Sequence, residues 1–199
     1  MFHDLNNSIE KLVTNDLNRP DVHIRFVTPD KIAKIATSIE KPSVNFFLYD
    51  VRENHDLSID VWRQERLPNG VVQRHQPPVQ IECAYLVSVW VPNDDEDTGA
   101  SDEYRLLGEV MKILMRYRIL PYAVLQGELK DKTPPVRAQT IQPGGLQSLS
   151  EFWQTIGNKP KASLNYTVRL SVELAEPEDL EVPVIQSVIS IRQGVEDDL

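Results

Sequence analysis

The stretch VQIECAYLVSVWV, residues 79–91, has the alternation of a strand at the centre of a β-sheet. Successive side chains of a strand point to opposite faces, so every second residue shares a face. Each odd-numbered position, from Val79 to Val91, carries an apolar side chain. The even-numbered face mixes polar and apolar side chains: Gln80, Glu82, Ala84, Leu86, Ser88 and Trp90. An alternation sustained this far predicts a long central strand.

Two further stretches have the composition or the period of long strands. Residues 43–54, SVNFFLYDVREN, are rich in aromatic and β-branched residues and have apolar side chains on both faces, as in a strand covered on two sides. Residues 163–174 alternate strictly, with the even-numbered positions facing inward. Residues 56–64 are expected to form a strand that can pair with the 43–54 strand as a hairpin. Two other short strands are expected at residues 22–29 and 182–191.

Helices are predicted where apolar residues recur three and four apart or where a capping signal precedes them. These segments are the opening residues up to Asn18, residues 29–39, residues 101–120 and residues 148–157. We therefore expect one α+β domain over residues 1–192, a mixed or antiparallel sheet with two to three helices packed on one side of it. Residues 193–199 are expected to form an acidic C-terminal tail.

Residues 101–120, SDEYRLLGEVMKILMRYRIL, predict a helix that is apolar around most of its circumference. Its charged side chains lie in one narrow stripe, which comprises Arg105, Glu109, Lys112 and Arg116. Apolar side chains cover most of the rest: Leu106, Leu107, Val110, Met111, Ile113, Leu114, Met115 and Tyr117. Such a helix needs partners on two flanks. One is the sheet, and the other is either a second element of this chain or a second chain.

Glu103 falls near the centre of the apolar face of this helix, beside Leu107, Val110 and Leu114. Two structural interpretations fit this position. An acid in the first turn suits the helix dipole and can lean out to water, whereas a buried carboxylate would pair with an arginine and fix a register. A catalytic role for Glu103 has no visible partner residue in the sequence.

The composition of the 199-residue chain argues against several classes of function. Its formal net charge of −9, from 30 acidic residues against 21 lysines and arginines, argues against nucleic-acid binding, because phosphate affinity needs clustered basic residues. A single cysteine excludes an internal disulfide and suits a reducing compartment. We find no signal-peptide pattern and no apolar run of membrane-spanning length, so we expect synthesis in the cytoplasm and no direct membrane insertion.

No sequence pattern indicates catalysis, a cofactor or a metal site. Cys83 lies in mid-strand among apolar neighbours, where a thiol is usually a small buried hydrophobe. The four histidines are not at zinc-ligand spacings, and the acidic loop at residues 93–99 lacks the terminal glutamate of a calcium loop. The sequence also contains no glycine-rich phosphate loop. We therefore expect a protein that is not an enzyme and has no catalytic, cofactor-binding or metal-binding residues.

Several motifs occur in an order and at spacings that resemble a known family. They are FFLYDVREN, AYLVSVWVPND, DEYRLLGEVMKIL and FWQTIG followed by ASLNYTVRLSVEL. With these motifs, over about residues 1–192, the chain resembles the tail-terminator, or cap, proteins of extracellular contractile injection systems, phage-tail-like particles that fire a tube through a sheath. We expect roles in the fold or in an interface for Tyr49, Glu53, Asn54, Glu103, Leu106, Leu107, Met115, Trp153 and Tyr166.

The resemblance implies a structural protein without a chemical step. It implies a homohexameric ring at the distal end of tube and sheath, where the ring ends the polymerisation of both and joins them. The implied partners are further copies of this chain and the tube and sheath proteins, in a particle that is released or membrane-anchored. The sequence has Tyr104 where the family often has histidine, and we expect no counterpart within residues 1–199 of a C-terminal extension that some members carry.

Two other functions stay open on the sequence. The first is an adaptor or anchoring role in the same kind of particle, which the same surfaces would serve. The second is a small ligand-binding or hydrolase domain, and it predicts a deep polar pocket around Glu103, Cys83 or His75.

Overall fold

The computed structural model describes residues 1–35, 40–54, 62–68, 70–92, 99–131, 134–141, 149–155, 160–176 and 178–180. The predicted α+β class is confirmed, because helices and strands follow one another along the chain without a regular alternation and the main sheet is mixed. Contacts within the chain define two compact units. The larger unit spans Met1–Ser58 and Pro78–Val172, and the smaller one spans Ile59–Pro77 and Glu173–Leu199.

The larger unit is built on a five-stranded sheet with the strand order β1-β2-β5-β7-β6. The strands are β1 (His23–Arg25), β2 (Ser43–Glu53), β5 (Val79–Trp90), β7 (Ser163–Val172) and β6 (Arg137–Thr140). Only β1 and β2 pair in parallel, and the other three pairs are antiparallel. The sheet is therefore mixed, with β5 at its centre as the alternation of that strand predicts.

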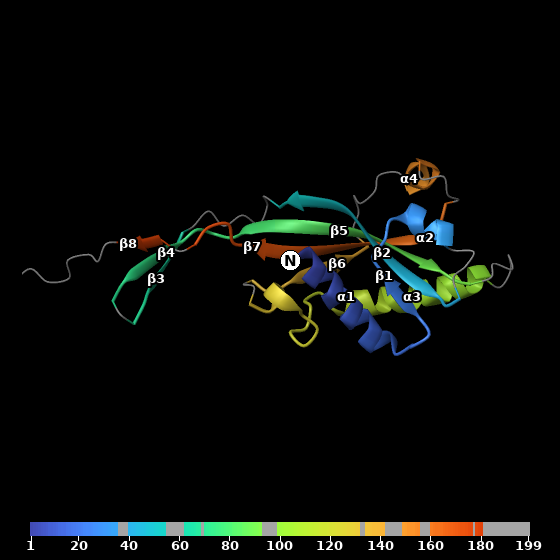
Figure 1. Cartoon of the computed structure of the whole chain (residues 1–199), viewed down its shortest axis with the longest axis horizontal. Coiled ribbons are helices and arrows are strands. Elements are labelled where there is room, and N and C mark those ends of the chain that lie inside the picture. The colour runs from blue at the N-terminus through green and yellow to red at the C-terminus, as the bar shows by residue number, and fades with distance from the viewer. Residues whose placement is uncertain are drawn as a thin grey trace, which may run out of the picture. The chain divides into compact units, whose positions relative to one another are not determined.

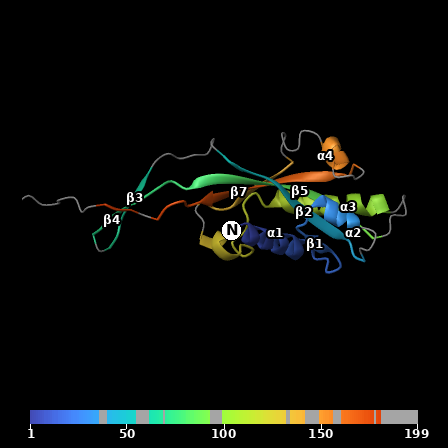
Figure 2. The ribbon, with the colours of Figure 1, turned by 45° about the horizontal axis from the view of Figure 1, so that its top comes forward.

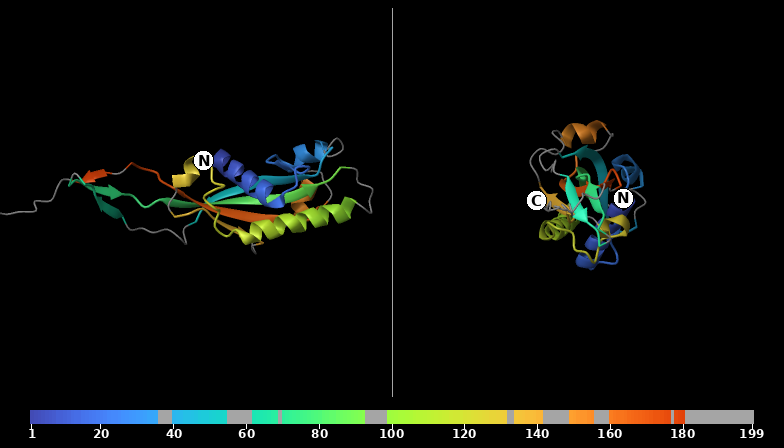
Figure 3. Two further views of the ribbon diagram at one scale, coloured as in Figure 1. Left: turned by 90° about the horizontal axis from the view of Figure 1, so that it is seen from below. Right: turned by 90° about the vertical axis from the view of Figure 1, so that its left-hand side faces the viewer.

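Two long helices, α1 (Phe2–Leu17) and α3 (Gly99–Arg116), lie on one side of this sheet, which we call the helix-covered face (Figures 1 and 3). The odd-numbered residues of β5 point toward them, and Cys83, Tyr85 and Val87 are fully buried there. Buried helix side chains in the same core include Leu5, Ile9, Val13, Leu106, Val110 and Leu114. This core confirms the predicted direction of the β5 side chains.

The opposite side of the sheet, the second face, is covered at one end by α4 (Leu149–Thr155) (Figure 2). Phe152 stacks on Phe47 at a centroid distance of 6.2 Å, and Trp153 meets Trp90 edge-on at 6.5 Å. Helices α1 and α3 confirm the expectation of two to three helices on one side of the sheet, and α4 is a further helix on the other side. It covers the aromatic patch of Phe47 and Trp90, which would otherwise expose a large apolar area to water.

A β-bulge interrupts the pairing of β2 with β5. The register passes from Leu48 to Asp50, so Tyr49 is the extra residue. Beyond the bulge the alternation of β2 is shifted by one position. As a result Arg52 lies opposite Glu82 on the second face.

Two short helices complete the larger unit. Helix α2 (Pro29–Ile35) contacts β2, and the residues just before it are fixed by the Asn45 amide, which accepts from Val27 N at 3.1 Å and donates to Val27 O at 2.9 Å. A 3₁₀ helix, η3 (Gly127–Asp131), contacts α1.

The smaller unit contains a three-stranded antiparallel sheet of β3 (Arg63–Arg66), β4 (Val72–His75) and β8 (Glu178–Leu180). The expected hairpin between residues 56–64 and the 43–54 strand is therefore wrong in its described part. Arg63–Arg66 pairs with β4 across a turn in which Leu67 N bonds to Val71 O at 2.8 Å. The antiparallel edge of β2 is already taken by β5, so it cannot accept a hairpin partner there.

Several predicted features lie outside the described residues: the strand at 182–191, the boundary between residues 192 and 193, the cap at Ser148 and most of the acidic loop at 93–98. Among the helices that the structure describes, none combines the length and the apolarity needed to cross a membrane.

Candidate assembly interface

Two of the predicted residues of β2 and its end, Tyr49 and Asn54, make contacts on the second face. The hydroxyl of Tyr49 donates to Oδ1 of Asn165 on β7 at 3.4 Å. The amide of Asn54 donates to Oε1 of Glu82 at 2.7 Å, whereas Glu53 lies opposite Ile81 and so belongs to the helix-covered side. The structure thus brings Tyr49 and Asn54 to one face of the sheet, but not Glu53.

Glu82 is the centre of a charged group that we call the Glu82 cluster, made of Glu82, Arg52, Asn54 and Arg169. Its carboxylate accepts from Nε of Arg169 at 2.7 Å and from Nε of Arg52 at 3.2 Å, in addition to the Asn54 amide. The Glu82 side chain is only 8% exposed. Burial opposes its ionisation, but the hydrogen bonds from Arg169, Asn54 and Arg52 outweigh burial, so the pKa of Glu82 lies below its ordinary value.

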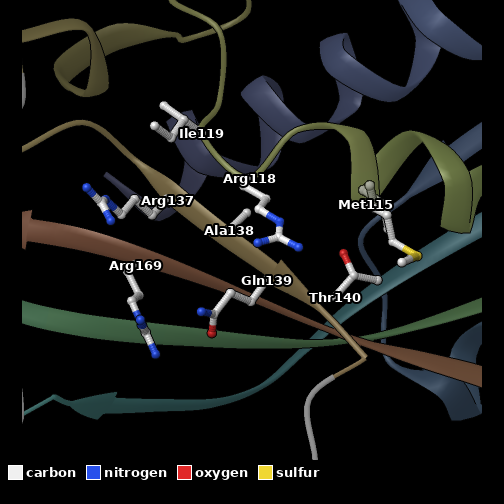
Figure 4. A pocket seen from close by; sticks show the side chains of 9 residues that line it. Met115, Arg118, Ile119, Arg137, Ala138, Gln139, Thr140 and Arg169 are labelled. Atoms are coloured by element: carbon white, nitrogen blue, oxygen red, sulfur yellow. The ribbon is translucent and has the colours of Figure 1, made fainter.

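Next to this cluster, a groove of about 540 Å³ follows β6, which is the last strand of the sheet (Figure 4). We call it the β6 groove. Its side chains come from the end of α3, the segment after α3, β6 and β7, and they include Met115, Arg118, Ile119, Arg137, Thr140 and Arg169. Arg169 belongs to both features, so the Glu82 cluster and the β6 groove form one continuous surface. Three arginines in a chain of net charge −9 make this surface locally basic.

Helix α3 meets the sheet on one flank and α1 on the other. Arg116 donates to Asp16 of α1 at 2.8 Å, and the Tyr117 hydroxyl reaches the same carboxylate at 3.0 Å. The second flank is therefore covered by another element of the same chain. Of the predicted residues, Leu106 is fully buried and Leu107 is partly buried. Met115, which is 51% exposed, points away from the core.

Glu103 forms an ion pair with Lys161, which precedes β7. Both side chains are largely buried, at 15% and 17% exposure, and the Lys161 ammonium also lies 4.7 Å from the ring centroid of Trp90. Of the two interpretations of Glu103, the paired carboxylate is the observed one, with a lysine in place of the expected arginine. This ion pair links the start of α3 to the segment just before β7.

The remaining predicted residues are parts of the core. The Trp153 side chain is 1% exposed and packs against Trp90. Tyr166 packs edge-on against Phe46, with ring centroids 6.3 Å apart. Burial raises the pKa of the Cys83 thiol to about 12, which keeps it protonated and unreactive at neutral pH. No group of three or more His, Cys, Asp or Glu among the described residues could hold a metal ion.

Sequence reasoning missed Glu82, Arg169 and Arg137 as members of one surface. Glu82 and Arg169 were assigned to outward faces of their strands. A signal was present, since an acid interrupts the apolar stretch of residues 79–91. The partner of that acid becomes visible only once the register pairs Glu82 with Arg169.

Comparison with known proteins places these features in a family context. The family described as the Pvc16 N-terminal domain matches residues 4–187. The structure is similar to a sheath/tube terminator of an extracellular contractile injection system, PVC, in its extended state, with a TM-score of 0.67 and 26% identity, over 100% of this chain and 65% of that one. It is also similar to the tube-terminating cap of the anti-feeding prophage, with a TM-score of 0.67 and 25% identity, over 96% of this chain and 62% of the other.

This chain thus spans about two thirds of the length of the solved proteins it matches. No protein in a search of curated proteins matches it.

Proposed function

The chain belongs to the family of the Pvc16 N-terminal domain, and from that premise we propose that it is the structural cap, or tail terminator, of a contractile injection system. In this role it ends the inner tube and the sheath and joins the two. The observation that carries the proposal is the similarity of the whole chain to a solved sheath/tube terminator at 26% identity. The family model that matches residues 4–187 supports the same conclusion.

The terminator acts as a homohexameric ring of identical subunits, as the family resemblance implies. A closed ring needs a head-to-tail contact in which two different patches of each subunit meet. Exposed apolar side chains on α3 and the segments that follow it, Tyr104, Met115, Ile119 and Tyr122, support such a contact. The predicted strand at 182–191 and the acidic tail at 193–199 are candidate segments for strand exchange with sheath subunits.

Binding alone accounts for this function, without a chemical step. The outer face of the ring offers no site for a further tube or sheath subunit, and polymerisation therefore stops at the ring. The acidic surplus keeps the free subunit soluble until its partners are present. The chain is made in the cytoplasm and becomes a component of an extracellular injection particle, released or membrane-anchored.

Particle length is the direct test. Electron microscopy of particles assembled with and without the chain should show defined tubes capped at the end opposite the baseplate only when the chain is present. Long tubes of variable length are expected without it. Particles of normal length in its absence would overturn the terminator role, and its location anywhere else on the particle would favour the adaptor or anchoring role.

Mass photometry of the purified chain, with and without the tube protein, tests the ring itself. We expect a homohexamer on the tube end. A chain that stays monomeric with tube protein in excess would contradict the ring.

A further inference from the structure

Among the residues that the structure describes, the outer edge of β6 is paired over only part of its length. Ala138 donates its N–H outward to the carbonyl of Arg118 at 2.9 Å, and Leu120 donates to Val136 O at 3.0 Å. Outward-directed positions recur at every second residue of an antiparallel strand. Thr140 therefore directs its N–H and its carbonyl outward as well. The covering segment cannot reach it, because the residues before Tyr117 are already in helix α3.

The groove beside this edge carries positive charge that the described part of the chain leaves unneutralised. Arg137 lies directly opposite Arg169 on β7, and like charges in cross-strand pairs are destabilising. Arg169 is bound by Glu82. Arg118 and Arg137 are both exposed, and no carboxylate of the described residues forms an ion pair with either of them. An acidic group from outside would relieve this repulsion.

The same groove contains a buried hydroxyl without a hydrogen-bond partner and two exposed apolar side chains. The Thr140 hydroxyl is buried and has no hydrogen-bond partner among the described residues. Met115, which is 51% exposed, lines the groove from α3, and Ile119, which is 50% exposed, lies directly opposite Arg137. Arg118 lies between Met115 and Ile119, and Arg137 and Arg169 line the groove on the side of the second face (Figure 4). Basic and apolar side chains thus line the groove together.

We propose that the β6 groove binds an extended acidic segment of another protein chain, which adds to the edge of the sheet at Thr140. A strand presents alternate side chains to opposite sides. Acidic side chains of the segment would reach the arginines, and the apolar side chains between them would lie against the exposed Met115 and Ile119. Backbone hydrogen bonds give affinity in this mode of recognition, and the alternate side chains give specificity. This surface assignment goes beyond the terminator role, because it depends only on the chemistry of the groove.

The test is fluorescence anisotropy with a labelled peptide of alternating glutamate and valine, titrated with the full chain at low salt. The groove variant carries Arg118→Glu and Arg137→Glu, both at exposed positions that leave the core intact. The matched control carries Arg105→Glu and Lys112→Glu, which change the net charge equally on exposed α3 positions outside the groove. We expect the groove variant to weaken binding by about tenfold or more and the control by less than about twofold.

Two further peptides separate the parts of the proposal. Replacing glutamate by lysine should abolish binding, and methylating the backbone nitrogens on one edge should weaken it even though every charge remains. Equal binding of the lysine peptide, equal loss in both double variants, or no binding to the wild-type chain would overturn the proposal. Self-association of the wild-type chain that the groove variant abolishes, without peptide binding, would assign the groove to a contact between copies instead.

Discussion

The two faces of the five-stranded sheet are built on different principles. The helix-covered face is a continuous apolar core in which side chains from α1 and α3 meet Cys83, Tyr85 and Val87. The second face has an aromatic end under α4 and a polar end around Glu82. The first face supplies stability through burial. The polar end of the second face holds charged groups in place by ion pairs and hydrogen bonds instead.

The largest expected effect separates the buried and exposed sides of helix α3. Leu114→Asp puts an unpaired charge at a position that is 2% exposed, and we expect it to cost about 4 kcal/mol or more of unfolding free energy. Met115→Asp, one residue on, should change it by less than about 0.5 kcal/mol and act mainly on assembly. Urea denaturation followed by circular dichroism measures both. Equal destabilisation by the two changes would break the distinction between the two sides of the helix.

The aromatic end of the second face should behave like a small core of its own. Trp153→Ala removes the side chain that α4 buries against Trp90, and we expect a loss of about 3 kcal/mol in unfolding free energy. Gln154→Ala, at an exposed position of the same helix, is the matched control. A loss below about 1 kcal/mol for Trp153→Ala would mean that α4 contributes little to the second face.

The Glu82 cluster should contribute stability that depends on pH. Glu82→Gln leaves Arg169 and Arg52 without their carboxylate, and we expect a loss of about 2 kcal/mol at neutral pH. The pKa of Glu82 is lower in the folded than in the unfolded chain. Its stabilising effect is therefore complete above the unfolded-state pKa and is lost as the pH falls through the folded-state pKa.

The stability difference between wild type and Glu82→Gln should consequently shrink below pH 4.5, the ordinary pKa of this group. Urea titrations between neutral and acidic pH measure it, with Glu10→Gln at an exposed position as the control. A difference that stays constant or grows on acidification would show that the carboxylate charge is not what stabilises the cluster.

The smallest effect is expected for the ion pair between Glu103 and Lys161. Glu103→Gln keeps the shape of the side chain but removes its charge, and we expect a loss of about 1 kcal/mol. Arg105→Gln, exposed on the same helix, is the control. An unchanged urea midpoint in Glu103→Gln would indicate that the pair orients α3 without stabilising it.

Features with a strong local period were predictable from the sequence. The alternation of residues 79–91 placed β5 correctly, and the spacing of Leu5, Ile9 and Val13 placed α1. Features that depend on pairing were not. Arg63–Arg66 was assigned to the wrong neighbour, because a single sequence does not reveal which strand edge is already occupied.

The candidate site was harder to predict than the fold for the same reason. Tyr49, Glu53 and Asn54 were identified through a family likeness, but Glu82 and Arg169 are 87 residues apart in the sequence and meet only through the strand register. Glu103 was found by its odd position on an apolar helix face. Its partner, Lys161, lies far from the helix in the sequence, and no periodic pattern connects the two positions.

The extra residue at Tyr49 has a consequence for how this protein can vary during evolution. Deleting Tyr49 would leave Leu48 opposite Tyr85 and Asp50 opposite Ala84 in an unbroken ladder, so Arg52 would keep its place opposite Glu82. A change of one residue in length is therefore tolerable at this bulge, whereas in a regular part of β2 it would turn the following side chains to the other face of the sheet. Lineages that diversify this subunit should therefore vary in length by one residue at the bulge more readily than elsewhere in the second strand.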